Sequence, residues 1–165
     1  MIQDVERRGV EESLYQLQPA IVVFNNTSAT TAPPDWTGQL NLDTTKIVTN
    51  TANLNITVTN RNIVVPEGYN FVEFQGGCGI MGYNGNVPST FGYVYLSPVI
   101  NGTQNAAFNG ITFSSEAKEA THYVSTSPLA VNVLPEHQLG LFIGNGSSVQ
   151  IRITSSWAMF KFYKI

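Results

Sequence analysis

SSWAMFKFY, residues 155 to 163, is the stretch that decides the fold class. Its residues alternate with a period of two, which places successive side chains on opposite faces of a β-strand. One face carries Ala158, Phe160 and Phe162, and the other carries Trp157, Met159, Lys161 and Tyr163. Both faces are largely apolar, a pattern typical of strands buried on both sides. We expect one face to fill the domain core and Trp157, Met159 and Tyr163 to pack on a second copy of the chain; the alternative is a loosely amphipathic strand with exposed aromatic side chains.

Short segments of similar pattern recur along the chain and are separated by turn residues. The predicted strands are 21–24, 54–58, 63–65, 69–81, 93–100, 106–113, 121–126, 129–134, 138–144, 149–154 and 157–163. Turn residues follow every eight to twelve positions, and the pair Asn101-Gly102 is a strong hairpin signal. We therefore predict an all-β fold, a jelly-roll β-sandwich of about ten strands with a short N-terminal helix or arm.

The N-terminal region has a different character. A helical stripe is formed by Ile2, Val5, Val10, Leu14 and Leu17. Pro19 ends this segment, and a helix so short needs a partner to be stable. Residues 25 to 45 resemble a long loop, with Trp36 pinning it to the body. The predicted domains are thus an attachment helix or arm with its linker, residues 1–45, and a jelly-roll head, residues 46–165.

Composition excludes several classes of function. The chain has 165 residues, which suits one domain, and only 12% of them are charged, about half the usual share. The net charge is −3 and the basic residues are scattered, so we expect no nucleic-acid partner. No apolar stretch reaches the ~18 residues that a membrane span needs, and no signal peptide is recognisable at the N-terminus.

Residues for chemistry are few. His122 and His137 are the candidate bases near neutral pH, and no nucleophile elbow or metal-binding motif accompanies them. The acids Asp35, Asp43 and Glu136 show no spacing that favours calcium. The single cysteine, Cys78, follows an apolar run and is interpreted as a small buried hydrophobe in preference to a reactive thiol. We expect no catalytic residue, no metal site and no cofactor; a small hydrolase is the minor alternative.

Three segments resemble a known superfamily. VPEGYNF (65–71), LAVNVLPEHQLGLFI (129–143) and the closing SSWAMFKFY are similar to strands of the globular heads of tumour necrosis factor and complement proteins. The resemblance covers roughly residues 52–165. It implies a ten-stranded jelly roll that forms tight trimers about an aromatic axis. Similar heads occur in phage and virus spikes, fibres and receptor-binding tips, where a short N-terminal segment attaches to the virion.

These observations favour a non-enzymatic virion structural protein: a trimeric spike, head fibre or decoration protein on the virion surface. Its partners would be two further copies of itself and capsid or other virion proteins, bound through the N-terminal segment. The alternative hypothesis is a head that binds a host receptor or surface glycan. In that case the contacts would come from two loops, through Tyr83, Asn84, Asn86 and Asn101.

Overall fold

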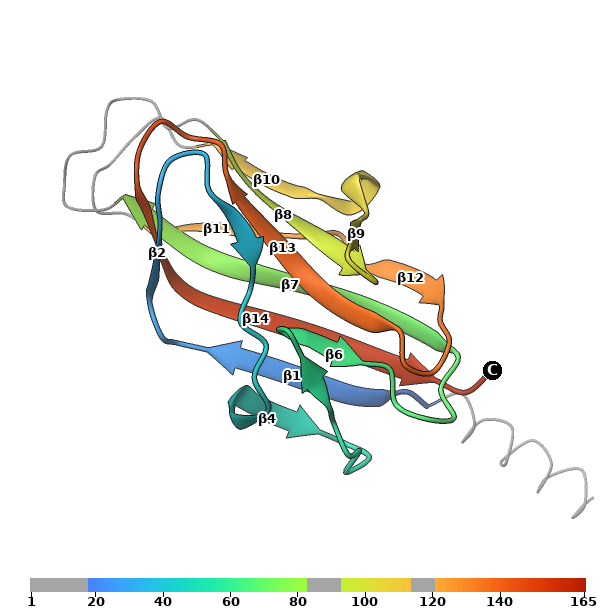
Figure 1. Cartoon of the computed structure of the whole chain (residues 1–165). Helices are drawn as coiled ribbons and strands as arrows, with labels where there is room; N and C mark the ends of the chain where they lie inside the picture. The colour runs from blue at the N-terminus through green and yellow to red at the C-terminus, as the bar shows by residue number, and fades with distance from the viewer. Residues whose placement is uncertain (1–17, 83–92, 114–120) are drawn as a thin grey trace, which may run out of the picture.

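Two antiparallel sheets of seven strands each form the molecule (Figure 1). The structure is a computed structural model, and it describes residues 18–82, 93–113 and 121–165. The first sheet has the order β11-β7-β14-β1-β4, with β12 also pairing β7 and β2 also pairing β14. Its strands are β1 (Ala20–Asn26), β2 (Thr30–Ala32), β4 (Ile47–Asn50), β7 (Phe71–Gly82), β11 (His122–Ser125), β12 (Leu129–Asn132) and β14 (Ile151–Tyr163).

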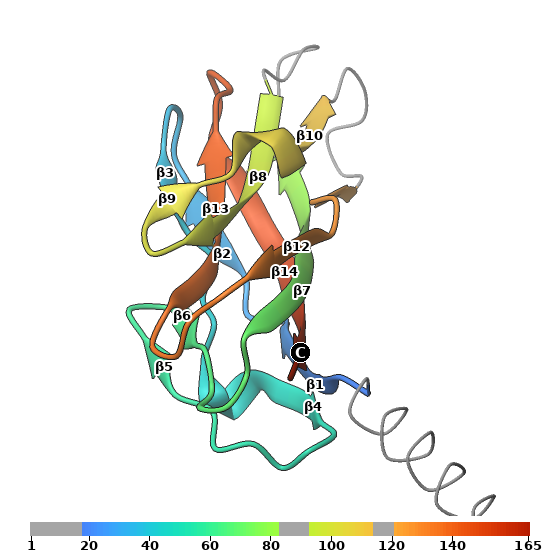
Figure 2. The same cartoon turned by 90° about the vertical axis from the view of Figure 1, so that its right-hand side faces the viewer.

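The second sheet has the order β10-β8-β13-β6-β5, with β3 pairing β13 and β9 pairing β8. Its strands are β3 (Thr37–Gln39), β5 (Val58–Thr59), β6 (Asn62–Val64), β8 (Tyr93–Ile100), β9 (Thr103–Gln104), β10 (Gly110–Phe113) and β13 (Gln138–Asn145). In Figure 2 the strands β9 and β13 lie on one side of the core and β7 and β14 on the other. The chain passes between the sheets after β2, β3, β4, β6, β7, β10, β12 and β13, which confirms the predicted jelly-roll sandwich.

Helical structure is minor in the described residues. Two 3₁₀ turns, η1 (Thr44–Lys46) and η2 (Ala106–Phe108), interrupt the strands. No helix among them has the length and apolar character needed to cross a membrane.

Strand β14 is the central strand of the first sheet. It pairs with β7 from Ile151 to Tyr163 and with β1 from Ser156 to Phe162. The sequence predicts two strands here, but the structure has one, with a register shift between Ile153 and Ser155. The buried positions 151 and 153 are followed by 156, 158, 160 and 162. One extra residue at the bulge thus lets both halves of the strand face the same core.

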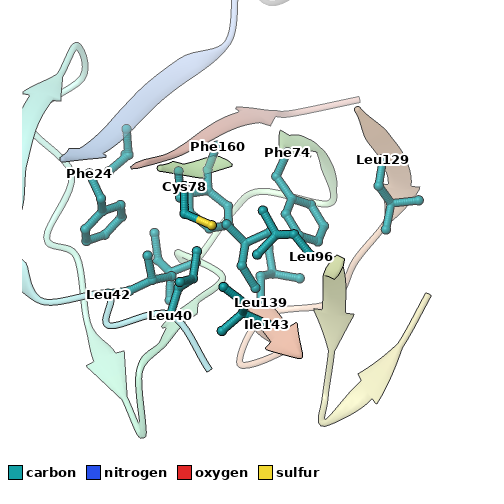
Figure 3. Packing of buried hydrophobic residues seen from close by; sticks show 14 of the residues in the cluster. Phe24, Leu40, Leu42, Phe74, Cys78, Leu96, Leu129, Leu139, Ile143 and Phe160 are labelled. Atoms are coloured by element: carbon teal, nitrogen blue, oxygen red, sulfur yellow. The ribbon is translucent and has the colours of Figure 1, made fainter. Parts of the chain in front are cut away.

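The core is built around Phe160, which is fully buried (Figure 3). Its ring stacks on Phe74 with centroids 5.4 Å apart and lies nearly parallel to Phe162 at 6.1 Å. Phe24 of β1 meets it edge to face at 6.0 Å. Leu139 and Ile143 of the facing sheet are fully buried in the same cluster. The alternation predicted for residues 157 to 163 is therefore confirmed on its core side.

The head starts earlier than the sequence suggests. Residues 20 to 45 contribute β1, β2 and β3, and Ala32, Leu40 and Leu42 are buried in the core. The structure moves the start of the body from residue 46 to Ala20. Beyond the predicted strand 21–24, the apolar residues Ala32, Leu40 and Leu42 occur singly among polar residues and prolines, so no periodic run indicates the strands β2 and β3. Residues 1–17 lie outside the described part.

Two further expectations need correction. The predicted strand 54–58 is reduced to β5 at Val58–Thr59, while Leu54 and Ile56 still pack against the core from irregular backbone. The predicted strand 106–113 pairs with β8 only from Gly110 onward, because Ala106–Phe108 forms the turn η2. The strand 93–100 and the turn at Asn101-Gly102 are confirmed.

Replacing Phe160 by Ala should lower the free energy of unfolding by about 3–5 kcal/mol, the usual cost of emptying a buried aromatic site. Val48, which is 62% exposed on β4, is the matched control, and Val48→Ala should stay within about 0.5 kcal/mol of wild type. Urea unfolding followed by circular dichroism measures both. Equal losses in the two variants would contradict the central role of Phe160.

Candidate assembly interface

The outer face of the first sheet gathers the residues that the sequence assigned to a subunit contact. Trp157, Met159 and Tyr163 all point away from the core on β14 and remain partly accessible. The register places Val23 of β1 beside Met159, and Ile21 beside Lys161. We call this surface, formed by the outward side chains of β1, β7 and β14, the outer face.

An aromatic pair borders the outer face at the start of β7. Tyr163 and Phe71 are cross-strand partners. Their rings meet edge to face with centroids 5.7 Å apart and an interplanar angle of 68°. Such a pair holds both rings in defined positions before any partner arrives.

Trp157 is held against the neighbouring strand by a glycine. Its cross-strand partner is Gly77, where an added Cβ would lie 2.6 Å from the indole Nε1. The same added Cβ would lie only 3.0 Å from the backbone oxygen of Val124. Only glycine therefore fits beneath this ring, and the aromatic side chain covers backbone that glycine leaves bare. Trp157 nevertheless keeps 37% of its surface exposed.

One ion pair lies within the outer face. Lys161 Nζ donates to Glu73 Oε1 at 2.7 Å, with 27% and 30% of the side chains exposed. The hydrogen bond to Glu73 raises the pKa of Lys161, although burial opposes the shift. The two charges neutralise each other across β7 and β14. The outer face therefore combines apolar side chains with an internally compensated polar centre.

The face extends toward β11 through Tyr123. This side chain is 76% exposed and stands opposite Gly79 of β7. Two exposed aromatic residues, Tyr123 and Trp157, thus share one side of the sheet. The structure brings the predicted contact residues together, and their role in assembly remains a prediction.

Of the two predicted receptor-contact loops, the structure describes only the one that contains Asn101. Tyr83, Asn84 and Asn86 lie outside the described residues. Asn101 is bonded to Gln138 at the start of β13: its side-chain Oδ1 accepts from the Gln138 backbone N at 2.8 Å, and its backbone N donates to the Gln138 carbonyl at 2.8 Å. Asn101 lies just beyond Ile100, at the end of β8 opposite to Tyr93. The role of these four residues in receptor contact stays a prediction.

The candidate attachment residues Ile2, Val5, Val10, Leu14 and Leu17 also lie outside the described part of the chain. No structural statement applies to them, and their role remains a prediction.

The histidines do not form a site with each other. His122 pairs with Ile80 near the end of β7. His137 lies in the turn before β13, where its Nδ1 accepts from the Leu134 backbone N at 3.3 Å. Its carbonyl accepts from Val65, which precedes β7 in the chain. The described residues contain no group of three or more His, Cys, Asp or Glu that could hold a metal ion.

Cys78 is buried on the core side of β7, with 2% of its surface exposed. Burial raises the pKa of its thiol to about 12, because the apolar surroundings disfavour the thiolate. The interpretation of Cys78 as a buried hydrophobe is confirmed.

The fold defines a class of protein. This chain has the jelly-roll fold of tumour necrosis factor and complement globular heads. The globular domain of zebrafish complement 1qA matches with a TM-score of 0.53 and 9% identity, covering 88% of this chain and 97% of that one. The Eiger TNF of S. frugiperda matches with a TM-score of 0.56 and 9% identity, covering 90% and 95%. Murine APRIL matches with a TM-score of 0.54 and 10% identity, covering 87% and 99%.

No family model matches the sequence. No curated protein matches it either. At 9–10% identity the structural matches establish the fold, and the function must be argued from the residues of this chain.

Cys78 should resist Ellman's reagent in the native protein at pH 8. The thiolate is the reactive form, and a pKa of about 12 leaves very little of it at that pH. After unfolding in urea the same reagent should titrate the single thiol of the chain. Rapid modification of the native protein, with an unchanged circular dichroism spectrum, would show that Cys78 is accessible and ionisable.

Proposed function

We propose that this chain is a non-enzymatic, homotrimeric head of a virion structural protein, a spike, head fibre or decoration protein. The observation that carries the proposal is β14, which is apolar on both faces although a monomeric sandwich buries only one of them. Phe160 and Phe162 fill the core, while Trp157, Met159 and Tyr163 remain on the outer face. Domains of this fold class are typically homotrimeric, which supports the proposed trimer.

The ion pair between Lys161 and Glu73 can be buried in a subunit contact at a lower cost in free energy than a single unpaired charge. Removing one unpaired charge from water is costly, whereas Glu73 and Lys161 already satisfy each other before association. An interface built on the outer face would therefore bury apolar rings around a neutral polar centre. A pair of this kind favours one register between subunits over others.

The head has two distinct ends. Ala20 pairs with Phe162, so the chain enters the body beside its own C-terminal strand. At the other end, Gly82 pairs with Ile151, eleven residues along β14 from Phe162. Eleven residues of strand span about 36 Å at ~3.3 Å per residue. This polarity supports attachment through residues before Ala20, with the opposite end of the head directed outward.

A role on the virion surface accounts for the remaining features. Charged residues make up 12% of the chain, and neutral Asn, Thr and Ser take their place. Binding by surface complementarity needs no catalytic group, and we assign none. The attachment segment would contact capsid or other virion proteins, and its length shortens from the predicted 45 residues to 19, since the body begins at Ala20.

The assembly state is the first test. Light scattering of the full chain should give a mass of about 54 kDa, three times the 18.0 kDa of one chain. Met159→Glu should dissociate it, because a carboxylate would be buried among apolar side chains. Thr103→Glu, on exposed β9 of the second sheet, is the matched control and should remain trimeric. A wild-type monomer at micromolar concentration, or equal dissociation of both variants, would overturn the proposed interface.

Attachment is the second test. Purified virus particles of the source should retain the full-length chain on co-sedimentation, and Leu14→Asp with Leu17→Asp should release it while the head stays trimeric. The physical reason is the loss of the apolar stripe of the N-terminal segment. Retention of the double variant at the wild-type level would contradict attachment through this stripe.

A further inference from the structure

A pocket of about 220 Å³ opens between the two sheets, away from the outer face. Trp36, in the segment that joins β2 of the first sheet to β3 of the second, is part of its lining. Both sheets contribute to its lining: Asn26 and Ser156 come from the first, and Gln39 comes from the second. The β14 residues in the pocket point inward, so the pocket is separate from the proposed trimer contact.

The lining combines an apolar base with polar walls. Leu40 and Ile153 are buried, with 4% and 6% of their surface exposed. Trp36 lies beside them, and its ring occupies the space that a Cβ on Gly38 would need. The backbone carbonyl of Trp36 accepts from Asn145 N at 2.7 Å, which anchors the crossing segment to β13. An aromatic ring is thus held in place in the lining of a pocket that has both polar and apolar surface.

Arg61 lines the same pocket from an unusual backbone position. Asn60 and Arg61 form the turn between β5 and β6 with φ values of 49° and 66°, both in the left-handed region. Hairpin turns of this type favour glycine at the second position. The equivalent turn between β8 and β9 follows that preference, with Asn101 at 49° and Gly102 at 79°. Arginine therefore occupies a position where glycine would be less strained, which points to a use for its side chain.

The Arg61 guanidinium has donors left for a ligand. Its Nη1 donates to the Gln39 carbonyl at 3.3 Å, which engages one of five N–H groups. Within the described residues the one ion pair joins Lys161 and Glu73, so Arg61 has no acidic partner there. It is also the only charged residue among those found to line the pocket. The guanidinium fork matches the oxygens of a carboxylate, as it does those of a phosphate, through two parallel hydrogen bonds.

We infer that the pocket binds one acidic sugar residue of a glycan, of the uronic acid or sialic acid class. The sugar carboxylate pairs with Arg61, the pyranose ring packs on Trp36, and the amides of Gln39 and Asn41 bind hydroxyl groups. The volume is below the roughly 300–1,000 Å³ of pockets that take drug-sized ligands, which limits the site to a single ring. Polar walls with one cation exclude a purely apolar ligand.

Calorimetric titration of the full chain tests the assignment with four probes: methyl β-glucuronide, a methyl sialoside, methyl β-glucoside and acetate. At least one acidic sugar should bind ten times or more tightly than both the neutral glucoside and acetate. The two acidic probes identify which source of the carboxylate the pocket prefers. Equal binding of the glucoside would overturn the role of Arg61, and equal binding of acetate would reduce the pocket to a simple anion site. Absence of binding by both acidic sugars would refute the inference.

Matched variants locate the site. Arg61→Gln should weaken acidic-sugar binding at least tenfold, while Lys164→Gln, which removes the same charge from an exposed residue beyond the end of β14, should leave it unchanged. Arg61→Gly should also lose binding, yet its resistance to urea should equal or exceed that of wild type because the turn is relieved of strain. Loss of binding in Lys164→Gln, or retained binding in Arg61→Gly, would overturn the assignment. Light scattering of each variant separates this result from any change of assembly.

Discussion

The stack of Phe160 between Phe74 and Phe162 is the contact on which the rest of the structure depends. It joins the two longest strands, β7 and β14, and directs alternate residues of both toward the facing sheet. Once these strands are in register, the pleat determines which of their residues point outward. Trp157, Met159 and Tyr163 must then lie on the side away from Phe160, because the pleat allows no other placement. The core and the outer face are therefore formed by alternate residues of the same strand, β14.

Strict alternation is what made much of the fold predictable. Strand β8 and the two faces of residues 157 to 163 follow directly from the sequence. The bulge after Ile153 was missed because it breaks the period, so that one strand was predicted as two. Strands β1 to β3 were assigned mostly to a linker, since Ala32, Leu40 and Leu42 stand alone among polar residues. Their burial arises from pairing with β13 and β14, more than a hundred positions later in the chain.

The outer face and the pocket also differ in how far the sequence alone predicts them. The sequence brought Trp157, Met159 and Tyr163 together because one strand carries all three. It had no means of joining Arg61 to Trp36, which line one pocket only after β3 and β6 have both paired with β13. A signal for Arg61 does exist in the sequence: Asn60-Arg61 stands between two strands where Asn-Gly is usual. Likewise, Gly77 is recognisable as a site of close approach, but the register that sets Trp157 above it is not.

Gly77 beneath Trp157 and Gly38 beneath Trp36 bear on how this chain can change over evolutionary time. In each case a large ring occupies the volume that a side chain on the glycine would require. In each glycine–tryptophan pair, neither residue can be substituted alone without a cost in stability. A larger residue at the glycine displaces the ring, and a smaller residue at the tryptophan exposes the backbone of the glycine to solvent. Both indoles of the chain are constrained in this way, one on the outer face and one in the lining of the pocket. Homologous heads should therefore exchange these residues in pairs, and an ordered series of single substitutions would have to pass through a less stable intermediate.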